Sequence, residues 1–198
     1  MFPTPPLVLA SGSPRRAALL RQAGVTLTVS PVPCDETAHI TEAAVAYARR
    51  IAADKRAAAV EALRDTLLPG QLVLTADTVV WVSEDNPKPL AKPPTRRACA
   101  TMLSEIGGPD GHHVTTAWTL GPADADATVH AVTTRVWMRP LHPQEREAYL
   151  ETDAWRDKAG GYGIQAEAAG WVTRIEGSYT NVVGLPVAEV VQALRGGQ

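Results

Sequence analysis

The feature that most restricts the fold of this chain is one long apolar run, QLVLTADTVVWV, at residues 71–82. Its β-branched and aromatic residues predict either one long buried strand or a pair of strands. The run contains a single carboxylate, Asp77. Alternate residues of a strand share a face, so Asp77 would point the same way as Thr75 and Val79. The chain must therefore bury a sheet and accommodate one acidic group on it.

That acidic group has two interpretations. An ionised carboxylate that is buried without partners costs several kcal/mol. A carboxylate that is retained on an apolar strand despite this free-energy cost is often a metal ligand or a general base. Alternatively, Asp77 is an ordinary strand-end residue whose oxygens accept hydrogen bonds from backbone amides.

A second informative stretch is LVLASGSPRR at residues 7–16, which predicts a strand, a tight turn and a helix. Pro14 suits the first helical position, and Ser13 suits the N-cap. Free N–H groups at a helix N-terminus bind anions, whereas Arg15 and Arg16 oppose the helix dipole there. A phosphate between the arginines and the amides would reverse that penalty. The alternative is two solvated surface arginines, because the P-loop signature and GxGxxG are both absent.

Two lysines are weaker candidates for the same anion. Lys55 falls on the apolar stripe of an alanine-rich helix predicted from residue 41 or 42 to 63, and Lys92 lies in LAKPP. A lysine on such a stripe usually extends its ammonium to water, and a loop lysine often serves solubility. Together with the two arginines, however, they would form a cradle for a triphosphate.

Asp35 and Glu36 are adjacent carboxylates at the exit of a predicted strand. A few carboxylates, completed by waters and phosphate oxygens, are what Mg²⁺ prefers. A solvated acidic turn is the alternative. The five histidines show no metal-ligand spacing, and His112 and His113 would point to opposite faces of a strand.

The rest of the chain predicts a mixed α/β fold. Apolar and β-branched runs predict strands, caps and helical periodicity predict helices, and one glycine-rich segment predicts a shaped loop. The predicted strands cover residues 7–10, 25–30, 71–82, 112–120, 127–138 and 171–175; the helices cover 14–23, 41 or 42–63, 95–106, 143–151 and the segment from 186; the loop covers 157–165. The short link between 112–120 and 127–138 favours an antiparallel pair.

Composition narrows the class of partner. The net charge of −2 gives no overall basic field, so we expect neither nucleic-acid nor membrane binding, and any anion site must be local. Neither a transmembrane run nor a signal peptide is apparent. Cys34 and Cys99 form no CxxC motif and indicate a reduced, cytoplasmic protein.

Several motifs occur in the order found in one known family. They are LASGSPRR, DE at 35–36, DK at 54–55, ADTVV, KP at 92–93, DKAGGYGIQ and GSYTNVVGLP. With these motifs the chain resembles the Maf family of nucleoside triphosphate pyrophosphatases, from about Leu7 to Pro186. SGSPRR and DKAGGYGIQ together carry most of the specificity of that resemblance.

The resemblance implies a single Maf-like domain over residues 1–198, with an elongated, twisted mixed sheet flanked by helices. It implies two lobes, a central cleft, a relation to the inosine triphosphate pyrophosphatase fold, and a homodimer. The implied reaction is hydrolysis of a nucleoside triphosphate to the monophosphate and pyrophosphate with a divalent cation, Mg²⁺ or Mn²⁺.

The resemblance also assigns roles to residues. Asp77 matches the family's proton acceptor, and Glu36, with Asp77, its metal site. The residues that match its phosphate-handling positions are Ser11, Arg15, Arg16, Lys55 and Lys92. Arg15, Thr78 and Gln165 match the specificity markers of the branch that acts on dTTP and UTP, and modified pyrimidine nucleotides are further candidate substrates.

Two other functions stay open at this point. One is a nucleotide-binding regulator of septum formation without turnover, and the other is an inosine-type purine pyrophosphatase. The chain also departs from the family pattern in two places. Ala91 precedes KP where Gly or Glu is common, and the loop SEDNPKP at residues 83–89 is longer than usual. Both changes affect where Lys92 enters the site.

Overall fold

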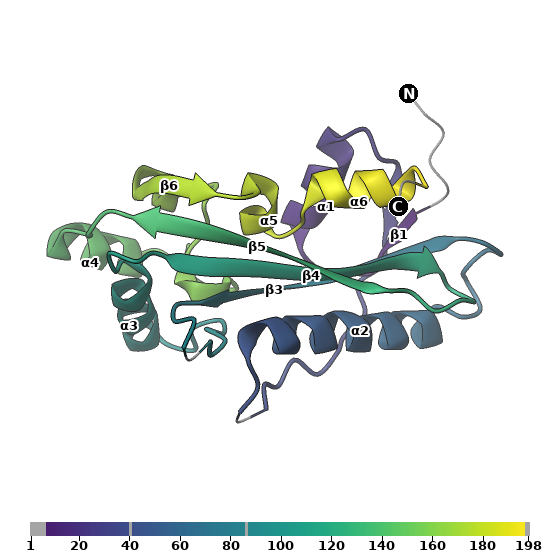
Figure 1. The fold of residues 1–198 in the computed structure, drawn as a ribbon, viewed down its shortest axis with the longest axis horizontal. Helices are drawn as coiled ribbons and strands as arrows, with labels where there is room; N and C mark the ends of the chain where they lie inside the picture. Colours follow the sequence, from purple (N-terminus) through teal and green to yellow (C-terminus); the bar gives the residue numbers. More distant parts are fainter. Residues whose placement is uncertain (1–6, 40, 86, 197–198) are drawn as a thin grey trace.

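In a computed structural model, which describes residues 7–39, 41–85 and 87–196, six strands form one sheet in the order β2-β1-β3-β4-β5-β6 (Figure 1). The strands are β1 (Leu7–Leu9), β2 (Leu27–Val29), β3 (Leu72–Trp81), β4 (His112–Pro122), β5 (Val129–Met138) and β6 (Val172–Glu176). β1 runs parallel to β2 and β3, whereas β3 to β6 are antiparallel to one another, so the sheet is mixed.

The helices flank this sheet. They are α1 (Pro14–Gln22), α2 (Ala44–Ala62), α3 (Arg96–Ile106), α4 (Pro143–Glu151), α5 (Tyr179–Val183) and α6 (Val187–Leu194), with 3-10 turns η1 (Ala159–Gly161) and η2 (Glu167–Gly170). Figure 1 shows an elongated, twisted sheet with α2 along one side, α1, α5 and α6 along the other, and α3 and α4 near one end. The predicted mixed α/β class is confirmed. In the described part of the chain, no helix is long and apolar enough to cross a membrane.

Small residues let α2 approach the sheet closely. Its buried alanines Ala44, Ala48 and Ala52 pack against Val79 and Trp81 of β3. Alternation along a strand therefore puts Asp77 on the α2 face and Thr78 on the opposite face, which is covered by the larger of the apolar clusters. Both predictions about the apolar run are settled: it is one long strand, and Asp77 shares a face with Val79.

The unequal lengths of β1 and β3 leave part of the sheet open. β1 pairs only with the start of β3, residues 72–74, and Val80 near the other end forms an isolated bridge with Leu90. Among the described residues, no strand pairs with residues 75–79 on that side. The carbonyls of Leu74 and Val80 both point to this edge, because they accept from Ala10 N and Leu90 N. Alternation then directs the backbone groups of residues 76 and 78 to the same edge.

A few boundaries and elements differ from the prediction. The helix expected from residue 41 or 42 begins at Ala44, and the strand expected over 25–30 is confined to Leu27–Val29. α5 was not predicted, because five residues are too few to show helical periodicity. The loop at 157–165 contains η1, which is allowed by the positive φ of Gly160.

Candidate active site

A cleft of about 940 Å³ lies over the open edge of β3. The turn between β1 and α1, helix α2, strand β3 and the segment 153–166 supply its walls. Every residue to which the family resemblance gives a role lines it: Ser11, Arg15, Arg16, Glu36, Lys55, Asp77, Thr78, Lys92 and Gln165. Residues from six separate parts of the chain are thus brought to one place. Asp35 is not among the lining residues, and its carboxylate accepts from Thr37 in a local exposed turn.

The acidic side of the cleft is organised by one lysine. Lys55 Nζ lies 2.8 Å from Asp77 Oδ1 and 2.7 Å from Glu36 Oε1. Lys92 Nζ lies 3.4 Å from the other oxygen of Glu36. Burial alone would raise the pKa of Glu36, but the hydrogen bond and charge of Lys55, aided by Lys92, outweigh it and lower that pKa. Lys55 therefore does not extend to water; it holds two carboxylates together.

Asp77 is the most unusual group in the cleft. Its side chain is buried, and only one of its oxygens is engaged, by Lys55. The other oxygen, Oδ2, is buried and has no hydrogen-bond partner among the described residues. Buried oxygens are normally satisfied, so this one indicates that a ligand, a cation or a water completes the site. The interpretation as a strand-end Asp bound by backbone amides does not describe it.

The donor set fits a divalent cation that takes few protein ligands. Asp77 and Glu36 offer carboxylate oxygens, and one of these oxygens lacks a partner. The described residues contain no group of three or more His, Cys, Asp or Glu able to hold a metal. Mg²⁺ tolerates this arrangement, because it is commonly bound by one or two carboxylates plus substrate phosphates.

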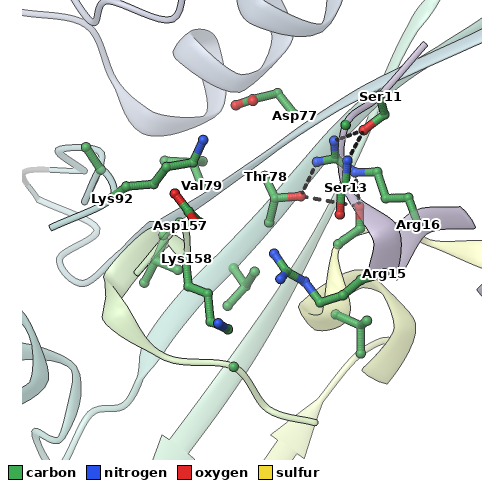
Figure 2. Close-up of a pocket in the computed structure, with 18 of the residues that line it drawn as sticks. Ser11, Ser13, Arg15, Arg16, Asp77, Thr78, Val79, Lys92, Asp157 and Lys158 are labelled. Carbon is green, nitrogen blue, oxygen red and sulfur yellow. Dashed lines mark hydrogen bonds between the residues drawn. The ribbon is translucent and has the colours of Figure 1, made fainter. Parts of the chain in front are cut away.

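Arg16 is anchored in the wall of the cleft (Figure 2). Its guanidinium donates to Gly184 O at 2.8 Å, Ser11 Oγ at 3.0 Å and Thr78 Oγ1 at 3.0 Å. A guanidinium has five N–H donors, so two remain for a ligand. Burial lowers the pKa of Arg16, and the charge of Asp77 opposes that effect. The side chain that was expected to bind phosphate also joins the turn after β1 to β3 and to Gly184.

The start of α1 keeps hydrogen-bond donors available. Ser13 occupies the N-cap position with an extended backbone, as predicted, but its side chain accepts no hydrogen bond from the helix. Ser11 Oγ accepts from Ser13 N and from Arg16, which leaves its own O–H free to donate. Uncapped amides and this hydroxyl suit an anion.

The specificity markers lie in different surroundings. The Thr78 hydroxyl accepts from Arg16 and lies 2.9 Å from Thr116 Oγ1, which donates to Asn181 O. Gln165 is exposed within the cleft, and its side chain makes no hydrogen bond with the residues that the structure describes. Thr78 is thus part of a fixed wall, whereas Gln165 is free to turn toward a ligand.

The unusual loop before Lys92 does not remove this lysine from the cleft. Leu90 N donates to Val80 O at 2.7 Å, and Pro87 O accepts from Ala44 N, the first residue of α2. The loop is therefore tied to β3 and to α2, and it delivers Lys92 to Glu36. Asn86, in this loop, lies outside the described residues.

Sequence reasoning missed several polar residues that line the cleft, two of them in one motif. Lys158 and Tyr162 line the cleft, and both belong to DKAGGYGIQ, which was predicted only as a shaped loop. The signal was available, since a lysine and a tyrosine amid four glycines or alanines stand out in a segment that needs an unusual backbone.

Comparison with known proteins gives one consistent family. A family model described as Maf-like protein matches residues 6–196. A dTTP/UTP pyrophosphatase of Rhizobium meliloti is 41% identical, covering 99% of this chain and 94% of its own. A relative in Caulobacter vibrioides has the same name and is 42% identical, covering 97% of this chain and 95% of its own. A third, in Alcanivorax borkumensis, is 43% identical and covers 95% of this chain and 93% of its own.

Among solved structures, a HAM1 protein from Coxiella burnetii aligns over 98% of this chain and 100% of that chain with 15% identity and a TM-score of 0.49. At that level of similarity, the expected relation to the inosine triphosphate pyrophosphatase fold stays a prediction. The family model and the relatives at about 40% identity span nearly the whole sequence, and the chain belongs to the family of Maf-like proteins.

Proposed function

We propose that this protein hydrolyses dTTP and UTP to the nucleoside monophosphate and pyrophosphate. The observation that carries the proposal is Asp77, a buried carboxylate with an unpartnered oxygen on the open edge of a strand, in a cleft lined by cations. The names of relatives at about 40% identity support the choice of substrate. Modified pyrimidine nucleotides remain candidates for the same site.

The cations of the cleft would bind the triphosphate. Arg15, Arg16, Lys55 and Lys92 line it together with the uncapped start of α1. A triphosphate repels an attacking nucleophile, and fixed positive groups in a sheltered site reduce that repulsion. Ser11 would add its O–H donor to the same anion.

Glu36 and Asp77 would hold Mg²⁺ or Mn²⁺. When bound, such a cation would supply positive charge against the phosphate oxygens and make a nearby water more acidic. Asp77 would accept a proton from the water as that water's oxygen bonds to the α-phosphorus. The bond from the α-phosphorus to the bridging oxygen breaks, and pyrophosphate leaves with the electron pair.

The base would be selected by Arg15, Thr78 and Gln165. An amide side chain can both donate and accept, which matches the N3–H and carbonyl groups of uracil and thymine. A site that hydrogen-bonds a substrate rejects analogues lacking the matching groups better than shape alone does. Cytosine presents an amino group where uracil has a carbonyl, so the guanidinium of Arg15, which can only donate, would disfavour it.

A substrate panel tests this proposal. Pyrophosphate release is measured with Mg²⁺ and with Mn²⁺ for dTTP, UTP, modified pyrimidine triphosphates, CTP and ITP. The expected result is preferential release from dTTP and UTP that stops when the cation is chelated. Binding of UTP without pyrophosphate release would favour a regulatory protein instead, and preference for ITP would favour a purine enzyme.

We further propose a homodimer and a single domain over residues 1–198, as the family resemblance implies, and a cytoplasmic location, as Cys34 and Cys99 indicate. Light scattering of the purified chain would test the first, since a dimer has twice the mass of the 21.1 kDa chain.

A further inference from the structure

The segment that carries Glu36 has no regular structure of its own. It joins β2 to α2, and from residue 31 to 38 it makes no hydrogen bond between two backbone groups with the described residues. Its backbone groups therefore depend on side chains or water for partners. A carboxylate on such a segment keeps a fixed place only if side chains from elsewhere hold the backbone that carries it.

Helix α2 supplies these side chains. The Tyr47 hydroxyl lies 2.9 Å from the carbonyl oxygen of Glu36, and it donates, because a carbonyl can only accept. Arg50, one turn further along the helix, donates to the next carbonyl, that of Thr37, at 3.1 Å. Two successive backbone groups are thus bound by neighbouring side chains of one helix.

The hydroxyl of Tyr47 has a fixed position itself. Its ring packs against the apolar cluster between α2 and the sheet. The guanidinium of Arg50 lies over the same ring, with 5.7 Å between Cζ and the ring centroid. Glu42 holds that guanidinium by accepting from Nε at 2.8 Å and from Nη2 at 2.7 Å, a two-point contact that sets its plane.

The same helix also binds the other end of Glu36. Lys55, two turns after Tyr47, lies 2.7 Å from Glu36 Oε1 and 2.8 Å from Asp77 Oδ1. The side chain of Glu36 is 38% exposed, so burial does little to fix it. One rigid element therefore sets the place of Glu36 relative to Asp77, with Tyr47 holding its carbonyl and Lys55 its carboxylate.

We propose that Tyr47 is a positioning residue of the cation site, whose hydroxyl fixes the backbone of Glu36 and so keeps its carboxylate beside that of Asp77. This inference rests on the proposed function, in which these two carboxylates hold Mg²⁺ or Mn²⁺. Residues that hydrogen-bond a metal ligand keep it in the orientation that the metal requires. Tyr47 lines the cleft, but its O–H is committed to Glu36, and it transfers no proton in the reaction.

Tyr47→Phe tests the proposal, because it removes the hydroxyl and keeps the ring that packs on the sheet. Mn²⁺ is titrated into the full chain, and electron paramagnetic resonance measures the free ion. The Kd for Mn²⁺ is expected to rise by about tenfold, as for loss of a group that orients a metal ligand. Tyr179→Phe is the matched control, because Tyr179 is exposed and lies outside the cleft.

UTP hydrolysis gives a second readout. The Mn²⁺ concentration for half-maximal rate should rise in Tyr47→Phe by the same factor as the Kd. At saturating Mn²⁺, kcat should return to that of the unchanged protein, because excess cation refills a weakened site by mass action. It cannot repair a damaged fold or a lost contact with the nucleotide. A melting temperature near that of the unchanged protein shows that the variant is folded.

A double-mutant cycle with Glu36→Gln shows whether Tyr47 acts through Glu36. Glu36→Gln should weaken Mn²⁺ binding by itself. Adding Tyr47→Phe to it should cause little further loss, because the hydroxyl then has no carboxylate to place. Losses that simply add would mean that Tyr47 acts elsewhere in the cleft, and they would overturn the inference.

Three other results would overturn it as well. They are Mn²⁺ binding by Tyr47→Phe equal to that of the Tyr179→Phe control, no Mn²⁺ binding by the unchanged chain, and a fall in kcat that saturating Mn²⁺ does not restore. Failure of the proposed function looks different. The unchanged chain would then release no pyrophosphate from any triphosphate, while its Mn²⁺ binding still depended on Tyr47 and Glu36.

Discussion

Arg15 and Arg16 are adjacent in sequence but have different surroundings. Successive residues of a helix point about 100° apart, so only one of the two side chains can turn back toward the sheet. Arg16 does so and is buried among oxygen acceptors from three parts of the fold, whereas Arg15 has no hydrogen-bond partner in the described residues. One arginine therefore supports the wall, and the other is available to a ligand.

Among single residues, Asp77 offers a direct test, because Asp77→Asn removes the proposed proton acceptor and leaves a side chain of nearly the same shape. We expect kcat for UTP to fall by about 100-fold to 10,000-fold, the usual contribution of a general base. Nucleotide binding, measured by calorimetry, should survive. Asp35→Asn is the matched control, since Asp35 lies in an exposed turn outside the cleft. Near-normal turnover by Asp77→Asn would exclude Asp77 as the base.

Gln165→Ala removes the exposed amide of the cleft. Because a pocket without that amide cannot pair with the edge of the base, the ratio of kcat/KM between UTP and CTP should fall by about 10-fold or more. Stability should be unchanged, as the side chain is exposed. Gln192→Ala in α6, outside the cleft, is the control. An unchanged ratio would remove Gln165 from base selection.

Among the elements, the loop at 157–165 depends on three buried side chains beneath it. Tyr149 Oη donates to Gly161 O at 3.1 Å, and Tyr162 Oη lies 2.7 Å from His112 Nε2. A Cβ at Gly161, where φ is 73°, would lie 2.6 Å from Cys99 Sγ. The segment that carries Lys158 and Gln165 is thus fixed to the core, although its own sequence shows no regular structure.

Tyr162→Phe tests this attachment. His112 Nδ1 lies 3.1 Å from Ile106 O, which can only accept, so Nδ1 carries the proton and Nε2 accepts from Tyr162. Loss of the hydroxyl leaves Nε2 buried without a partner, and the free energy of unfolding should fall by about 1–3 kcal/mol. Urea unfolding measures this, with exposed Tyr179→Phe as control. Equal stability of the two variants would contradict the attachment.

On the scale of the whole molecule, the cleft follows from unequal strand lengths. β3 has ten residues and β1 has three, so β3 continues past its parallel neighbour with an open edge. Helices cover both faces of the sheet there and supply Lys55 from one face and Arg15 from the other. A carboxylate in the middle of the open stretch is sheltered by both layers yet remains accessible to a ligand.

His112 couples the stability of the whole molecule to pH. Burial lowers the pKa of His112 to about 4, against an ordinary value of 6.5. Between those values the unfolded chain binds the proton and the folded chain does not, so stability falls as pH drops from 6.5 to 4. The loss attributable to this group approaches about 3 kcal/mol at the lower end.

Unfolding at several pH values tests this coupling. The slope of unfolding free energy against pH between 6.5 and 4 should be shallower in His112→Asn. It should be unchanged in His39→Asn, because His39 is exposed. Parallel slopes for all three proteins would show that His112 is not the group responsible.

The sequence by itself determined most of the helices and strands and which residues line the site. Periodicity, caps and turn residues report local preferences, and these predicted all six strands and five of the six helices in the described chain. Residue type and motif order also identified nine side chains that line one cleft.

Only the tertiary structure decided what each of those side chains does, because their partners are remote in sequence. Arg16 meets a carbonyl 168 positions away, and Lys55 meets a carboxylate 22 positions away. The open edge of β3 depends on where β1 stops, and the side chain of Lys158 has its place because residue 163 is a glycine. No local pattern encodes such contacts, since they form only when the layers of the fold pack together.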